Sequence, residues 1–309
     1  MSTDIGRIIK DALETQCEAF TQLTKDATQL LCDEDGNVGN LSIKGRLVKI
    51  NPSGQALIVG DLHGDLESLI DILKKSNYLQ KLNSSQDTYL IFLGDYGDRG
   101  VFSAEVYYVV MKLKLLFPEQ VVMMRGNHEG PPDLMARPHD LPLQFQRRFG
   151  KNWRYAYAAV RRMFGCLYSA VLVEGRCLLI HGGLPQQVDT IEDLAYAHST
   201  YPQRDFLEDM LWSDPDETIE ETSMSPRGAG KLFGRKVTER ILGKLGVKAL
   251  IRGHEPCQDG FKINHNGKVL TVFSRKGPPY FNPHGAYLDM DLSDKLEDAS
   301  QLISRIHKF

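Results

Sequence analysis

The stretch QALIVGDLHGD, residues 55–65, decides how this 309-residue sequence is interpreted. Its first half is a short run of apolar and branched residues, which is typical of a strand buried on both faces. Its second half sets Asp61 and His63 among glycines, so that a tight loop can turn both side chains the same way. Asp65 can then cap a helix with apolar residues on one face between 66 and 73. The stretch thus predicts a strand, a polar loop and a helix in succession.

The same succession recurs along the chain. Short apolar runs end in glycine or close to a polar residue, and helical stretches separate the earlier runs. The runs are QALIVG (55–60), TYLIFLG (88–94), QVVMMRG (120–126), CLLIHG (177–182), VKALIRG (247–253) and VLTVFS (269–274). One predicted helix spans residues 103–116 and stops before Pro118. Buried strands alternating with helices indicate the α/β class, although alternation alone also allows a doubly wound sheet.

An N-terminal segment with a different pattern precedes these strands. Apolar residues recur at helical spacing from Ile5 to Leu31, which predicts an amphipathic helix or a helix pair. A turn rich in Asp, Asn and Gly follows at CDEDGNVGN (32–40). We therefore expect residues 1–50 to form a helical segment packed on a domain of residues 51–309. A structural role is favoured for this segment over a regulatory surface.

Composition narrows the possible partners. The hydrophobic fraction of 42% and the charged fraction of 25% are ordinary for a globular protein, and the net charge is −3. This net charge gives no overall electrostatic attraction to nucleic acid or to an anionic membrane, and we expect neither as a partner. Basic residues between 147 and 162 alternate with aromatic ones. A solvated helix face with its aromatic rings inward is favoured there over a nucleic-acid surface.

Cysteine usage and the N-terminus favour a cytoplasmic protein. The five cysteines are odd in number and lack C-x-x-C spacing, so reduced thiols are expected instead of a disulfide framework. No apolar run approaches the roughly 18 residues that span a bilayer. The start, MSTDIGRIIKDALE (1–14), lacks the apolar block of a secretory signal.

Five of the predicted strands deliver possible metal ligands where they end. Carboxyl ends of strands in open α/β sheets converge on one site, so we expect these side chains to lie together. The mixture of nitrogen and oxygen favours Mn, Fe or Zn over Ca or Mg, and the lack of thiolates argues against a structural zinc site. Asp95 carries two oxygens that could bridge two cations. The candidates are Asp61, His63, Asp95, Asn127, His181 and His254.

Three of these loops resemble, in order and spacing, the signature motifs of the phosphoprotein phosphatase family of serine/threonine-specific enzymes, within the calcineurin-like metallophosphoesterases. The motifs are GDLHGD (60–65), GDYGDRG (94–100) and GNHE (126–129), and the resemblance continues through HGGLP (181–185), MLWSDPDE (210–217), SPRGAG (225–230) and RGHE (252–255). It covers roughly residues 55 to 290. The resemblance implies a central β-sandwich flanked by α-helices, with the active site at the carboxyl ends of the strands.

The resemblance also assigns roles. It implies one metal ion held by Asp61, His63 and Asp95, and a second held by Asp95, Asn127, His181 and His254. Such a pair, about 4 Å apart, activates a hydroxide that attacks phosphorus directly. His128 would act as general acid for the leaving serine or threonine, oriented by Asp98. Arg99, Asn127 and Arg227 would bind the phosphate. The remaining histidines, His139 among them, are expected in surface or loop roles.

Two segments depart from the family pattern, and alternatives follow. GPPDLMARPHDL (130–141) lacks the continuation common after GNHE, and FSRKGPPYFNPHGA (273–286) leaves the role of Tyr280 unassigned. The function predicted is hydrolysis of phosphoserine and phosphothreonine in phosphoprotein substrates, and regulatory subunits are a further candidate class of partner. The alternative is a nucleotide-directed metallophosphoesterase of the diadenosine tetraphosphatase type. A non-catalytic scaffold is disfavoured because every ligand and the acid are present.

Overall fold

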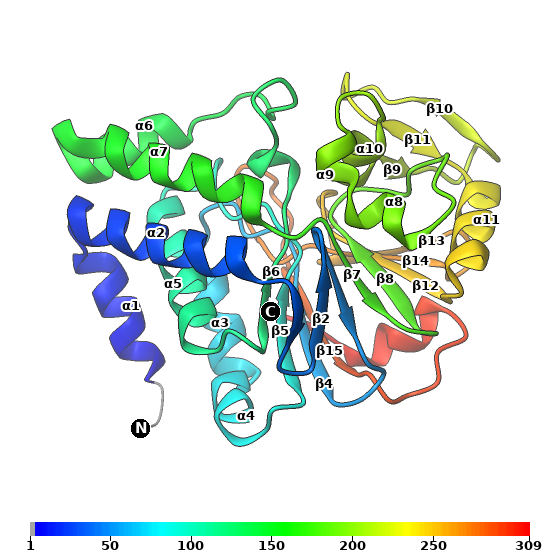
Figure 1. Cartoon of the computed structure of the whole chain (residues 1–309), viewed down its shortest axis with the longest axis horizontal. Coiled ribbons are helices and arrows are strands. Elements are labelled where there is room, and N and C mark those ends of the chain that lie inside the picture. The colour runs from blue at the N-terminus through cyan, green and yellow to red at the C-terminus, as the bar shows by residue number, and fades with distance from the viewer. Residues whose placement is uncertain (1–3) are drawn as a thin grey trace.

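Two β-sheets lie at the centre of the computed structural model, which describes residues 4–309, and helices cover both outer sides (Figure 1). One sheet has the order β1 (Gly36–Val38), β2 (Leu41–Lys44), β3 (Leu47–Ile50), β7 (Ala170–Val173), β8 (Cys177–Ile180), β12 (Ala249–Arg252), β14 (Val269–Val272) and β13 (Phe261–Asn264). The other has the order β16 (Ile306–Lys308), β15 (Ala286–Asp291), β4 (Gln55–Val59), β5 (Thr88–Phe92) and β6 (Val121–Met123). The predicted α/β class and central sandwich are confirmed.

Side-chain alternation explains why the larger sheet is buried on both faces. Val171 and Val173 of β7 share one core with the residues of the smaller sheet. Their neighbours Ala170 and Leu172 lie in a second core together with residues of α10 and α11. Because successive side chains of a strand point to opposite faces, one face of this sheet packs on the other sheet and the opposite face on helices.

The helices form two groups, one on each flank (Figure 1). Beside the smaller sheet lie α1 (Ile5–Glu14), α2 (Cys17–Asp33), α3 (Leu66–Lys75), α4 (Tyr78–Ser84), α5 (Ser103–Leu116), α6 (Leu141–Phe149) and α7 (Trp153–Met163). Beside the larger sheet lie α8 (Ile191–Ala195), α9 (Ala197–Thr200), α10 (Phe206–Trp212) and α11 (Arg235–Leu245), with a small sheet of β10 (Thr222–Met224), β11 (Lys231–Phe233) and β9 (Asp214–Pro215). Short 3₁₀ turns are η1 (Asn127–Glu129), η2 (Gly150–Asn152), η3 (Phe164–Cys166) and η4 (Ala299–Arg305).

The local sequence signals are largely confirmed. All six predicted strands form, α5 spans the predicted residues, and the Asp65 carboxylate accepts a hydrogen bond from the Ser68 N–H at 2.9 Å as the cap of α3. The expected helical segment of residues 1–50 is wrong beyond Asp33. Residues 36–50 form β1, β2 and β3, because their apolar side chains alternate with polar ones and suit a sheet face. That residues 51–309 form a separate domain stays a prediction.

The cysteine prediction needs one correction. Cys32 and Cys166 are joined in a disulfide, whereas Cys17, Cys177 and Cys257 are free and buried. The two bonded residues lie 134 positions apart, a separation that leaves no signal in the sequence spacing. Within residues 4–309, no helix is both long and apolar enough to cross a membrane.

Candidate active site

The two sheets bring the predicted ligands to one place, which we call the strand-end rim: the loops that follow β4, β5, β6, β8 and β12. Strands β4, β5 and β6 are parallel, so the loops that carry Asp61, Asp95 and Asn127 leave the smaller sheet at the same edge. Strands β8 and β12 are parallel in the larger sheet, and His181 and His254 follow them. The six predicted ligands are all buried.

Ring nitrogens and carboxylate oxygens face each other across short gaps at the rim. His63 Nε2 lies 3.7 Å from an Asp61 oxygen and 3.5 Å from Asp95 Oδ2. His181 Nε2 also lies 3.5 Å from Asp95 Oδ2. Two ligands of one ion with bonds of ~2.1 Å lie roughly 3–3.5 Å apart, so these separations fit a shared cation better than direct hydrogen bonds. Two groups could each hold a metal ion: His63, Asp95 and His128, and Asp95, His181 and His254.

Backbone contacts fix the way two of these rings face. His63 Nδ1 lies 3.0 Å from the Gly97 carbonyl oxygen, and His181 Nδ1 lies 3.0 Å from that of Leu93. A carbonyl only accepts, so each Nδ1 carries the proton and each Nε2 keeps its lone pair for the rim. Asn127 Oδ1 lies 3.1 Å from both His181 Nε2 and His254 Nδ1, which places this amide in the second group.

The electrostatics of the rim favour a bound cation. Burial raises the pKa of Asp61 to about 7, and burial together with the charges of Asp61 and Glu129 raises the pKa of Asp95 well above its usual range. Burial also lowers the pKa of His63, His181 and His254 far enough to keep the rings neutral. Asp61 Oδ2 and His254 Nε2 are buried without hydrogen-bond partners among the described residues. Paired carboxylates and neutral imidazoles with free lone pairs fit divalent metal ions.

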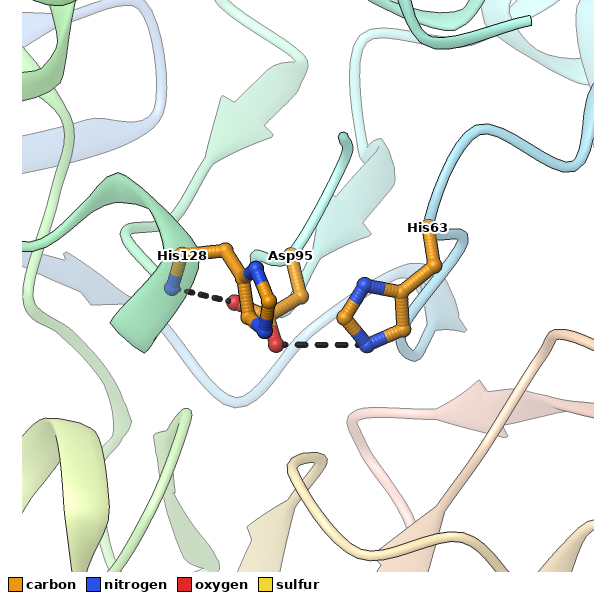
Figure 2. Close-up of side chains that lie close together, drawn as sticks. All are labelled: His63, Asp95 and His128. Carbon is orange, nitrogen blue, oxygen red and sulfur yellow. Dashed lines mark hydrogen bonds and ion pairs between the residues drawn. The ribbon is translucent and has the colours of Figure 1, made fainter. Parts of the chain in front are cut away.

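The predicted acid and its carboxylate lie directly beside the metal-ligand cluster. Figure 2 shows the backbone N–H of His128 directed at the Asp95 carboxylate, with the His63 ring on the other side of that carboxylate. The distance from the backbone nitrogen of His128 to Asp95 Oδ1 is 3.0 Å. His128 Nδ1 lies 2.6 Å from Asp98 Oδ2. Although burial alone would raise it, hydrogen bonds from His128 and His139 hold the pKa of Asp98 below its usual range.

An open pocket of about 700 Å³ lies above the cluster. Arg99, Arg227 and His128 line it together with ligands of both groups, and Tyr280 closes one side with its ring 5.4 Å from that of His63. Arg227 Nε donates to Asp214 at 2.6 Å, and the buried Arg252 holds the other oxygen of Asp214 at 2.8 Å. The structure therefore brings four predicted ligands and both phosphate-binding arginines to one cavity, whereas Asp61 and His181 are fully buried next to those ligands. Asp98 lies behind His128.

Sequence reasoning missed two residues that shape the site. Glu129 is fully buried, and its carboxylate accepts the N–H groups of Asp95 at 2.8 Å and Gly126 at 3.1 Å. It thereby holds Asp95 in a left-handed backbone conformation, with φ of 54°. Its place as the last letter of GNHE is the only signal that could have found it. His139 lies in a loop, as expected, but its ring also hydrogen-bonds the Asp98 carboxylate, a contact that sequence reasoning did not anticipate.

These features define a metallophosphoesterase-type hydrolase, with strand-end loops that converge on paired carboxylates and imidazoles. The family model of the calcineurin-like phosphoesterases matches residues 55–258, and the chain belongs to that family. It is 32% identical over 281 residues to the serine/threonine-protein phosphatase 4 catalytic subunit of Candida glabrata, which covers 89% of this chain and 83% of that protein.

Two further comparisons agree. A probable serine/threonine-protein phosphatase of Encephalitozoon cuniculi is 32% identical over 260 residues, 83% of this chain. The chain spans only 54% of that relative's length. A solved serine/threonine phosphatase of Saccharomyces cerevisiae superposes with a TM-score of 0.75 at 22% identity, covering 96% of this chain and 90% of that one. This likeness confirms the fold predicted from the motifs.

Proposed function

We propose that this protein hydrolyses phosphoserine and phosphothreonine in protein substrates. One observation carries the proposal: two groups of buried side chains share Asp95 beside a pocket that Arg99 and Arg227 also line, and these groups are His63, Asp95 and His128, and Asp95, His181 and His254. The relatives named as serine/threonine-protein phosphatases support the choice of substrate class. No observation of the site favours a nucleotide substrate.

The first group of metal ligands is proposed to be Asp61, His63 and Asp95, and the second Asp95, Asn127, His181 and His254. When bound, such ions lower the pKa of water and offset phosphate charge. Mn, Fe or Zn suits the nitrogen and oxygen donors. A cytoplasmic location and a need for regulatory subunits stay predictions.

The side chains around the pocket are proposed to bind the phosphate and to protonate the leaving oxygen. Arg99 and Arg227 present guanidinium groups, which match phosphate oxygens in paired geometry and stabilise charge that develops in the transition state. The Asn127 amide adds a polar contact to the phosphate. The serine or threonine oxygen departs as an alkoxide unless a proton reaches it, and His128 is positioned to donate that proton from Nε2. Asp98, bonded to Nδ1 at 2.6 Å, fixes the ring for that transfer.

A substrate comparison tests the proposal. The purified protein, first chelated and then supplied with Mn²⁺, is assayed in parallel on a phosphothreonine peptide and on diadenosine tetraphosphate. We expect Mn²⁺-dependent release of phosphate from the peptide and no comparable turnover of the nucleotide. The His128→Gln variant should lose ~10²-fold or more on the peptide, whereas His307→Gln, an exposed histidine outside the pocket, should retain full activity. Cleavage of the nucleotide alone would contradict the proposed substrate class.

A further inference from the structure

The segment that departs from the family pattern, residues 130–141, supplies a second histidine to the Asp98 carboxylate. His139 Nδ1 lies 2.7 Å from Asp98 Oδ2, the same oxygen that His128 Nδ1 contacts at 2.6 Å. The Leu141 N–H donates to the other oxygen, Oδ1, at 2.6 Å. Asp98 therefore accepts three hydrogen bonds, two of which come from the segment that the family motifs do not predict.

A helix residue holds His139 in turn. His139 Nε2 lies 2.9 Å from the hydroxyl of Tyr157 on α7. Since the Asp98 carboxylate can only accept, Nδ1 of His139 carries a proton, and the Tyr157 O–H can donate to Nε2 of the neutral ring. The His139 side chain is 15% exposed, and both of its nitrogens are then satisfied. The result is a continuous chain of hydrogen bonds: Tyr157, His139, Asp98 and His128.

The same segment also holds the neighbouring arginine. The Asp140 carboxylate accepts a hydrogen bond from the Arg99 N–H at 3.0 Å, and the Arg137 carbonyl accepts one from the Arg99 guanidinium at 3.3 Å. Asp98 and Arg99 have left-handed backbones, with φ of 64° and 72°. Non-glycine residues hold such conformations only where their surroundings fix them. Residues 137–141 thus brace both the carboxylate behind the acid and a phosphate-binding arginine.

We propose that His139 is a positioning residue for the His128 acid, and that Tyr157 supports it through the same chain. The inference rests on the proposed function, because it assumes that His128 donates a proton to the leaving oxygen as the P–O bond breaks. With His139 in place, Asp98 Oδ2 is held between two rings, and the His128 ring keeps the orientation that directs Nε2 to the pocket. Without His139, that carboxylate loses one of its three donors and can rotate away from His128.

The leaving group provides a readout that a purely structural role would not move. An alkoxide leaves poorly and needs the acid, whereas the p-nitrophenolate of an aryl phosphate leaves without much help. We measure kcat and KM on a phosphothreonine peptide and on p-nitrophenyl phosphate. His139→Leu should lower kcat on the peptide ~10-fold or more with KM changed less than ~2-fold, and the loss on the aryl ester should be several-fold smaller.

Two further variants test the role of His139 even if His139→Leu folds poorly. His139→Asn places an amide N–H near the former Nδ1 position and should recover most of the peptide activity. Tyr157→Phe removes only the outer hydrogen bond and should show a smaller loss with the same leaving-group dependence. Its matched control is Tyr155→Phe, on the same helix but 72% exposed, which should change neither substrate.

The outcomes separate the two hypotheses. Equal losses on both substrates, or no recovery in His139→Asn, would overturn the role of His139. The reference variant is His128→Gln, which should show the strongest leaving-group dependence of the set. If His128→Gln loses the same factor on both substrates, the proposed acid itself is wrong, whatever the His139 variants do.

Discussion

The protein buries charge in two regions, and the two are organised in opposite ways. At the strand-end rim, Asp61 and Asp95 lie close together, and Asp61 Oδ2 and His254 Nε2 have no hydrogen-bond partners among the described residues. On the helical flank, Glu34 and Lys114 form an ion pair of 2.6 Å with side chains at most 3% exposed. The charged side chains of both regions are buried from solvent, so burial alone does not distinguish the two regions.

The two regions differ in whether their buried polar atoms have hydrogen-bond partners. Lys114 Nζ donates both to Glu34 and to the Pro118 carbonyl at 2.8 Å, and the Tyr168 hydroxyl donates to the second oxygen of Glu34. The charges on the flank are thus paired within the chain, and these contacts connect the end of α2, helix α5 and the residues just before β7. Charge at the rim is left with like-charged neighbours and free lone pairs, because its partner is a ligand from outside the chain. This contrast identifies the rim as the functional region and predicts different responses to the same kind of substitution.

The largest expected effect is at the rim. Asp95→Asn removes the carboxylate shared by both ligand groups, and phosphothreonine-peptide hydrolysis should fall ~10³-fold or more. The chelated variant should be as stable as the chelated parent, or more stable, because one of two repelling buried carboxylates is gone.

Thermal unfolding with added metal is the second measurement on this variant. A ligand at 100 times its Kd stabilises a protein by ~2.7 kcal/mol, so Mn²⁺ should raise the unfolding temperature of the parent but not that of Asp95→Asn. Full Mn²⁺ stabilisation of Asp95→Asn would contradict the bridging role.

The flank should respond in stability and not in activity. Glu34→Gln leaves the buried Lys114 ammonium without its counter-charge, which typically costs ~3–5 kcal/mol. Urea unfolding should show the loss, while peptide hydrolysis by the fraction that remains folded stays at the parental rate. Glu34→Gln combined with Lys114→Met removes both charges and should recover much of the stability. A loss of activity without a loss of stability would contradict the division between the two regions.

The sequence made the rim predictable and left the flank hidden. Glycine-flanked strand ends are local patterns, and parallel pairing brings such ends to one edge, so Asp61 and His254 could be placed together although 193 positions separate them. Glu34 and Lys114 lie 80 positions apart, and neither stands in a pattern that marks a partner. The Cys32–Cys166 disulfide joins residues two positions before Glu34 and Tyr168, and it escaped prediction for the same reason.

The position of His139, which the sequence also did not reveal, has the same physical origin. His139 stands in an irregular loop whose course depends on tertiary contacts with Asp98 and Tyr157. No periodicity or motif fixes such a loop, so the position of its side chains follows only from the folded chain. Motif matching is thus reliable for residues on strand ends and fails where loops are held by long-range contacts.

The smallest expected effect tests whether burial or the N···O distance sets the contribution of an ion pair to stability. Lys44 and Glu192 form an ion pair with the same N···O distance as the flank pair, 2.6 Å, but their side chains are 47% and 50% exposed. Water screens exposed charges and solvates whichever partner remains, so Glu192→Gln should leave the urea midpoint unchanged within error. Glu34→Gln is the matched substitution, since it makes the same chemical change at a buried pair of equal length. A destabilisation by Glu192→Gln close to that of Glu34→Gln would mean that pair geometry, and not desolvation, sets the contribution of these ion pairs.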